Sequence, residues 1–201
     1  CGSEGSRDDV SAEAASENEN KDAANRAAVW DAVLRGSDED IKAALQQPGM
    51  DWSVDGHNVL AVFLMERVST PFEEARSKDA KGIIRLLVEL GADVNMHMQV
   101  MADDEQQPMK ELKPIAGNTV LHVAINGGKI HKTTGEMTYL PPEIVQLLLD
   151  LGSDVTLRSV NENDLGYSCL HYALSRSDVE IIDMLLHRGA DPNAQCDSGS
   201  T

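Results

Sequence analysis

The chain has 201 residues, of which 34 are acidic and 17 are basic, so its formal net charge is −17. This charge repels nucleic acids and anionic membrane surfaces, and neither is an expected partner. The sequence holds no run of about eighteen apolar residues, so it predicts no segment that spans a bilayer.

Residues 1–24 are small, polar and acidic, and almost none of them could enter a hydrophobic core, so we expect a disordered tether. The start, Cys1-Gly2-Ser3, resembles a mature bacterial lipoprotein, whose signal peptide is removed before a cysteine that carries lipid. The resemblance implies lipidation of Cys1 and a periplasm-facing place in the cell envelope. Gly2 beside the cysteine implies the outer membrane. The alternative is an arbitrary cut at a cysteine, with the protein in the cytoplasm or in a host cell.

Amphipathic helices are predicted where apolar residues recur at helical spacing before a glycine. The glycine can close the helix with a positive φ, and the aspartate, proline or asparagine residues after it form a turn. This closing pattern occurs as GIIRLLVEL before Gly91, EIVQLLLDL before Gly152 and IIDMLLHR before Gly189. A weaker copy ends at Pro48 and Gly49.

A second pattern opens each pair of helices. It occurs as GNTVLH from Gly117 and as GYSCLH from Gly166, more loosely over 56–61 and most faintly over 29–32. Two helices of this length cannot bury both apolar faces alone, so each pair needs neighbouring pairs.

Together these patterns resemble the ankyrin repeat, which runs G-x-T-P-L-H, two antiparallel helices and then G-A-D-V-N. The resemblance implies an all-α fold, an ankyrin-repeat solenoid of about four helix pairs with a long finger and inter-helix insertions. It covers 25–201, with repeats at about 25–55, 56–95, 117–157 and 166–195 and a partial cap at 196–201. The residues that carry the motif are Thr119, Leu121, His122, Leu170, His171, Gly91, Gly152 and Gly189.

His122 and His171 stand at the histidine position of the opening motif, where the family uses the ring to hydrogen-bond successive loops. Catalysis would need a nucleophile or a carboxylate within defined reach of a histidine, and the sequence shows no such constellation. It also lacks a phosphate-binding loop and a metal cage. We therefore expect a protein that is not an enzyme and needs no cofactor.

The connection over 96–116 is longer than the family needs, and in this fold it forms a finger that overhangs the concave partner-binding surface. Its soft side chains predict an adaptable contact surface for a partner, with simple packing as the alternative. These residues are Met96, His97, Met98, Met101 and Met109. A copper(I) site at Met96, His97, Met98 and Met101 is a weaker candidate, because the ligands are soft but irregularly spaced.

Two insertions separate the two helices of a repeat. Residues 69–80 contain a capping box with a proline at the first helical position, so we expect them to lengthen an outer helix. Residues 129–142 place Tyr139 and Leu140 before two prolines, which favours an exposed, preorganised anchor for a partner. The alternative is that Tyr139 covers the end of the outer helix. Because only 3% of the chain is aromatic, an exposed tyrosine is informative.

The last repeat is predicted to hold a short helix over 172–176, then a capping box of Ser177 and Glu180 that starts the next helix. Cys169 replaces the proline of the family motif, and Cys196 lies at the start of the following loop. The two could pair in an exported protein, or they could be buried or reduced thiols.

These observations predict a non-catalytic protein–protein binding module whose partner carries a basic patch. The sharper hypothesis is a lipid-anchored immunity protein that neutralises a secreted toxin or hydrolase, such as a lipase. One alternative is a scaffold or chaperone that stabilises an envelope protein, including a metal-handling one. Another is a soluble effector directed at a host cell.

Overall fold

The computed structural model describes residues 24–47, 52–68, 77–98, 117–126, 129–130, 137–160, 166–199 and 201. Residues 1–23 of the predicted tether, with Cys1, lie outside the described residues, as do the capping box of the first insertion, Met101 and Met109. The chain divides into two compact units, Cys1–Met50 and Asp51–Thr201. None of the helices in the described residues is long and apolar enough to cross a membrane.

The first unit holds a helix over 24–35 and α2, Asp38–Leu45. Ser37 caps α2, because its Oγ accepts from the Asp40 amide while the Asp40 carboxylate accepts from the Ser37 amide at 2.7 Å. These hydrogen bonds from Ser37 lower the pKa of Asp40. Ser37 and Asp40 thus form a capping box at the start of α2.

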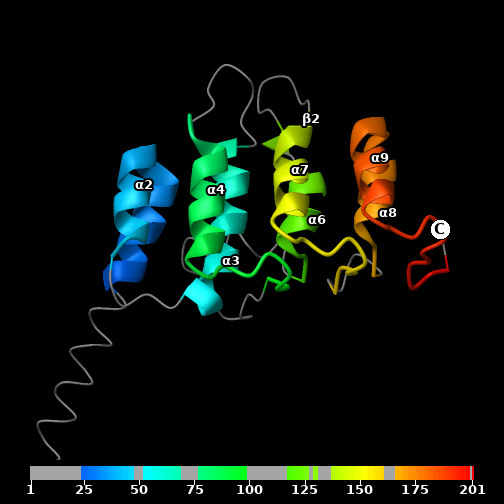
Figure 1. Ribbon diagram of the computed structural model, residues 1–201, viewed down its shortest axis with the longest axis horizontal. Helices are drawn as coiled ribbons and strands as arrows, with labels where there is room; N and C mark the ends of the chain where they lie inside the picture. The colour runs from blue at the N-terminus through cyan, green and yellow to red at the C-terminus, as the bar shows by residue number, and fades with distance from the viewer. Residues whose placement is uncertain are drawn as a thin grey trace, which may run out of the picture. The chain divides into compact units, whose positions relative to one another are not determined.

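The second unit consists of helix pairs in two layers (Figure 1). The inner layer holds α3, α6 and α8, and the outer layer holds α4, α7 and α9, which face the viewer in Figure 1. Each outer helix packs on the inner helix of its own pair, and α6 also packs against α3 and α8. The bounds are Trp52–Phe63 for α3, Ala80–Glu89 for α4, Val120–Asn126 for α6, Pro142–Asp150 for α7, Cys169–Arg176 for α8 and Val179–His187 for α9. This arrangement is the predicted all-α solenoid.

Burial follows from the place of each helix in its layer. All six residues from Val120 to Ile125 of α6 are buried, because α6 has neighbours on both sides and an outer helix behind it. The outer helix α7 buries one face and leaves Glu143 and Asp150 exposed. The core of the second unit therefore runs through the middle of the helix pairs.

Short non-α elements interrupt this pattern. The π-helix η1, Leu64–Val68, directly continues α3. The insertion of the third repeat carries two antiparallel strands, β1 (Lys129–Ile130) and β2 (Met137–Thr138), with Lys129 opposite Thr138. The insertion thus begins as a small hairpin before α7 starts at Pro142.

The closing glycines adopt the positive φ that the sequence predicts: 115° at Gly91, 95° at Gly152 and 91° at Gly189. The amide that follows each glycine donates to the carbonyl five residues before it, at 3.0 Å in all three turns. An aspartate carboxylate then accepts from the amide two residues ahead, again at one distance, 2.8 Å. These aspartates are Asp93, Asp154 and Asp191. The glycine and the aspartate that the three sequences share therefore build the same turn each time.

Three predicted boundaries are wrong. The looser opening copy over 56–61 lies inside α3, which begins at Trp52. Helix α8 begins at Cys169, three residues before the predicted start. Asp178 caps α9, because its Oδ1 accepts from the Ile181 amide, whereas Ser177 takes a left-handed φ of 56° that ends α8. A carboxylate is an effective cap, and the connection between α8 and α9, Ser177 and Asp178, is one residue longer than predicted.

Candidate protein-binding face

The opening motif holds the start of each inner helix through its histidine. In α6 the Nδ1 of His122 accepts from the Thr119 amide at 3.2 Å and lies 2.8 Å from its Oγ1. In α8 the Nδ1 of His171 accepts from the Ser168 amide at 3.2 Å and lies 2.7 Å from its Oγ. Because Nδ1 accepts, the hydrogen of the neutral ring lies on Nε2. These Nδ1 bonds lie within one motif, whereas the prediction placed the histidine bonds between successive loops.

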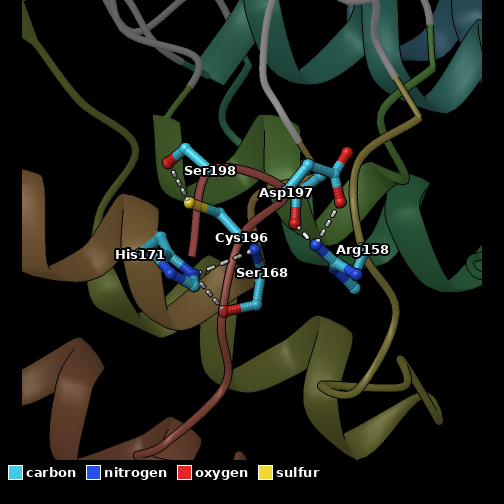
Figure 2. A network of polar contacts seen from close by, with 7 residues as sticks. Arg158, Ser168, His171, Cys196, Asp197 and Ser198 are labelled. Atoms are coloured by element: carbon cyan, nitrogen blue, oxygen red, sulfur yellow. Dashed lines mark hydrogen bonds and ion pairs between the residues drawn. The ribbon is translucent and has the colours of Figure 1, made fainter. Parts of the chain in front are cut away.

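The loops between the repeats are joined by polar contacts around Arg158 (Figure 2). The Arg158 guanidinium donates to the Gly166 carbonyl at 2.7 Å and to the Asp197 carboxylate at 2.7 Å. The Arg158 carbonyl in turn accepts from Nε2 of His97 at 2.9 Å. Backbone bonds between Met98 and the loop at Gly117 hold the same edge. Three successive loops are thus fixed against one another.

Aromatic rings gather beside these loops. The rings of Tyr167 and His171 stack with centroids 5.4 Å apart and planes 26° apart. Tyr172 meets Tyr167 edge to face at 5.9 Å and meets His122 edge to face at 5.7 Å. Its hydroxyl donates to Asn118 at 3.4 Å. The cluster therefore links the opening motifs of two repeats.

One side of this cluster is open. Five residues line an open hollow of about 350 Å³, which we call the aromatic hollow: Asn126, Tyr167, His171, Tyr172 and Ser175. They come from the end of α6, the loop before α8 and one side of α8. Leu174 of α8 is 50% exposed, one turn from His171. Ring faces, an amide and hydroxyls thus meet on the inner layer, where a partner could place a side chain.

Sequence reasoning missed this site, although it included the stretch that forms it. Tyr167 and Tyr172 are two of only three tyrosines in the chain, and they lie four residues before and one after the motif histidine His171. That spacing was a usable signal. Helical spacing alone does not predict that they share a face, because Tyr167 belongs to a loop and Tyr172 to a helix.

The finger residues that were expected to bind a partner have different environments. Met96 is 38% exposed and keeps this role as a prediction. Met98 is buried at 2% exposure, because its backbone pairs with the loop at 117–118, so its prediction as a contact surface is wrong. His97 is tied to the carbonyl of Arg158 through Nε2. Two of the four candidate copper ligands are therefore used in the packing of the protein itself.

Tyr139 and Leu140 also have different environments. Leu140 is buried at 1% exposure, so its prediction as an exposed anchor is wrong. Tyr139 is 37% exposed, and the guanidinium carbon of Arg176 lies 4.0 Å from its ring centroid. Arg176 also donates to the Ile125 carbonyl at 2.5 Å and pairs with Asp178 at 3.1 Å. Burial lowers the pKa of Arg176, and Tyr139 covers this cation at the end of α8.

Cys169 and Cys196 are both reduced and buried in the described structure. Burial raises the pKa of the Cys169 thiol, and the negative charge of Asp154 adds to the effect. The Sγ of Cys196 lies 3.0 Å from the Oγ of Ser198 (Figure 2). Of the two predicted states, the structure shows the thiol state.

Two helical layers, repeated closing turns and loops fixed against one another define a helical-repeat protein with a recessed face on its inner layer. A family model for ankyrin repeats, in three copies, matches residues 10–196, and the chain belongs to this family. The chain is 28% identical over 169 residues to the B-cell lymphoma 3 protein homolog of Mus musculus. That match covers 74% of this chain and 33% of the mouse protein, so the chain spans about a third of the length of this curated relative. Ankyrin repeats indicate a protein–protein binding module, and the family is typically non-catalytic.

Proposed function

We propose that the chain binds one protein partner through the inner-layer face formed by the aromatic hollow and Leu174. The observation that carries this proposal is the open hollow beside a half-exposed leucine on α8. Tyrosine gives a large contact area for little loss of conformational freedom, and an exposed apolar neighbour adds area that binding removes from water.

The face is also preordered. The Ser168–His171 pair fixes the start of α8, and the contacts of Arg158 fix the loops on either side. A surface that is already ordered loses less entropy when it binds, so more of the contact energy contributes to affinity.

The test is capture of a partner by the full 201-residue chain from an extract of the source organism, followed by affinity measurement with the captured protein. We expect Leu174→Glu to weaken binding at least about tenfold, since it places a charge in the buried centre of the interface. Val179→Glu is the matched control, because Val179 is 76% exposed on the outer helix α9. Equal affinities of the two variants would refute the proposed face.

The proposal extends to the charge of the partner. With 34 acidic and 17 basic residues, the chain favours a partner with a basic patch and speeds their encounter. The association rate with the captured protein should therefore fall steeply as salt is raised from about 50 to 500 mM, while the dissociation rate changes little. A rate that is independent of salt would contradict this part.

The finer proposal is that the partner is a secreted toxin or hydrolase, such as a lipase, and that the chain is its immunity protein in a bacterial envelope. It is supported by the acidic charge and by analogy with small acidic inhibitors. A strain without the gene should lose resistance to neighbouring cells, and unchanged resistance would overturn the role. Lipidation of Cys1 is a separate prediction, which the intact mass of the native protein tests.

A further inference from the structure

We infer that the aromatic hollow receives an arginine side chain from a basic segment of the partner. The inference rests on the proposed function, because it names the chemistry that the same face recognises. It follows from the rings, the polar groups and the charges around the hollow.

The rings provide a surface for a planar cation. Tyr167 is half-buried and stacks on His171, so it presents a fixed aromatic wall beside the opening. A guanidinium stacks on such a wall through its delocalised charge. The same pairing already occurs within the chain, where the guanidinium of Arg176 lies 4.0 Å from the ring centroid of Tyr139.

The remaining lining groups suit the five N–H donors of a guanidinium. Asn126 and Ser175 are exposed at the rim of the hollow and offer an amide oxygen and a hydroxyl oxygen as acceptors. A lysine ammonium is a compact, strongly hydrated charge that gains less from a flat ring and a fixed set of acceptors. The hollow therefore favours arginine over lysine.

The described side chains that line the hollow bring no lysine or arginine charge against a cationic guest. None of the five lining residues is a lysine or an arginine, and His171 accepts a hydrogen bond at Nδ1 as a neutral ring does. The two arginines closest in the chain are each paired, Arg176 with Asp178 and Arg158 with Asp197. The net charge of −17 attracts a basic segment toward the face.

The probes are four peptides, acetyl-Gly-Ser-X-Ser-Gly-amide, in which X is arginine, citrulline, lysine or proline. Citrulline keeps the shape of arginine and removes its charge. Each is titrated into the full-length chain and followed by the NMR signals of Tyr167, Ser175 and the Asn126 side-chain amide. We expect the arginine peptide to bind about fivefold more tightly than each of the others, with shifts centred on these residues.

Variants separate the ring face from general attraction to an acidic chain. Tyr167→Phe should keep the preference for arginine over citrulline, because it keeps the ring. Tyr167→Leu should abolish that preference while the helices stay folded, as judged by circular dichroism. Val179→Ala, on the outer helix, should leave it unchanged.

Equal binding of the arginine and citrulline peptides would overturn the inference, and so would a preference that survives Tyr167→Leu. Proline binding as tightly as arginine would also overturn it and would assign the hollow to an apolar guest. The two proposals fail separately. If Leu174→Glu abolishes partner capture while arginine and citrulline bind alike, the binding face stands and only the arginine assignment falls.

Discussion

The opening motif occurs in two neighbouring repeats with the same local geometry and different surroundings. The Nδ1 of His122 and that of His171 each accept from an amide at 3.2 Å and lie within 2.8 Å of a hydroxyl. Yet His122 is 1% exposed, whereas His171 is half-buried and lines the aromatic hollow. The motif sequence therefore determines the hydrogen bond of the histidine. The neighbouring helices determine whether its ring is buried or partly exposed.

The same contrast holds three residues further along each helix. Ile125 of α6 is fully buried, whereas Leu174, at the matching position of α8, is 50% exposed. In the loop before each helix, Asn118 is buried, and Tyr167 takes its place as a ring that faces the hollow. The proposed binding face thus lies where the neighbouring repeat does not fully cover these positions and where their side chains differ from those of the central repeat.

The largest expected effect concerns Cys169, which stands where the central repeat has Val120. Both side chains are fully buried, and the raised pKa of Cys169 keeps it as an unreactive thiol. We expect alkylation of Cys169 by iodoacetamide to be slower in the native protein than in urea by on the order of a thousandfold, because reaction requires opening of the helix pair. Site-resolved mass spectrometry gives the rate.

Cys196 is the internal comparison, since it is 4% exposed in the segment after α9 and should react faster than Cys169. The raised pKa of Cys169 also means that its contribution to stability is present below the unfolded thiol pKa, about 8.5, and is lost as pH rises above it. Equal rates at the two cysteines would show that opening of the helix pair does not limit the reaction of Cys169.

The next effect separates the two histidines. His122→Ala should lower the free energy of unfolding by about 2–3 kcal/mol, because it leaves a cavity and unpaired groups within the core. His171→Ala should cost about 1 kcal/mol, since one side of its ring lines an open hollow. Urea denaturation at constant m-value measures both changes. Losses of equal size would mean that the motif itself, rather than its neighbours, determines the energetics.

Much of the fold could be predicted from the sequence because the motifs that begin and end its helices are local. Gly91, Gly152 and Gly189 close helices as predicted, since a positive φ and a following aspartate need only a few adjacent residues. The start of α3 at Trp52 was missed because residues 52–58 are poor helix formers, and the packing of α3 against its neighbours overrides that local preference. Local patterns therefore predict the repeats correctly but place some helix boundaries wrongly.

The candidate site depends on contacts that no local pattern reports. Met98 was predicted as surface, but its backbone pairs with the loop at Gly117, on the far side of an eighteen-residue gap in the described chain. Leu140 was predicted as exposed beside Tyr139, yet only Tyr139 remains at the surface. Adjacent residues can point to opposite environments, and burial depends on which distant element covers them.

A smaller effect tests how the last described repeat is held to the central one. Arg176 joins them by donating to the Ile125 carbonyl while the ring of Tyr139 covers its guanidinium. Tyr139→Leu should cost about 0.5–1 kcal/mol through loss of the cation–π contact, and Tyr139→Phe should cost close to nothing. The two urea midpoints distinguish these cases. If both variants lose the same stability, the hydroxyl rather than the ring face makes the contact.

The smallest effect lies in the closing turn between these repeats. The hydroxyl of Thr156 donates to Asp154 at 2.6 Å and its amide donates at 2.8 Å, and both bonds lower the pKa of Asp154. A lowered carboxyl pKa contributes stability that is present above the unfolded value, about 3.9, and is lost as pH falls through the folded value. Because Asp154 is exposed, Thr156→Val should cost only a few tenths of a kcal/mol at pH 7.

That cost should shrink as pH falls through the folded pKa of Asp154, because a protonated carboxyl no longer gains from the hydroxyl as a carboxylate does. The turn at Asp191 offers a natural control, because Asn193 stands at the position of Thr156 and supplies the same 2.8 Å amide bond. Thr156→Asn should therefore behave like Thr156→Val. Urea midpoints of the three proteins at several pH values test this prediction, and a cost that persists unchanged in acid would assign the effect of Thr156 to packing.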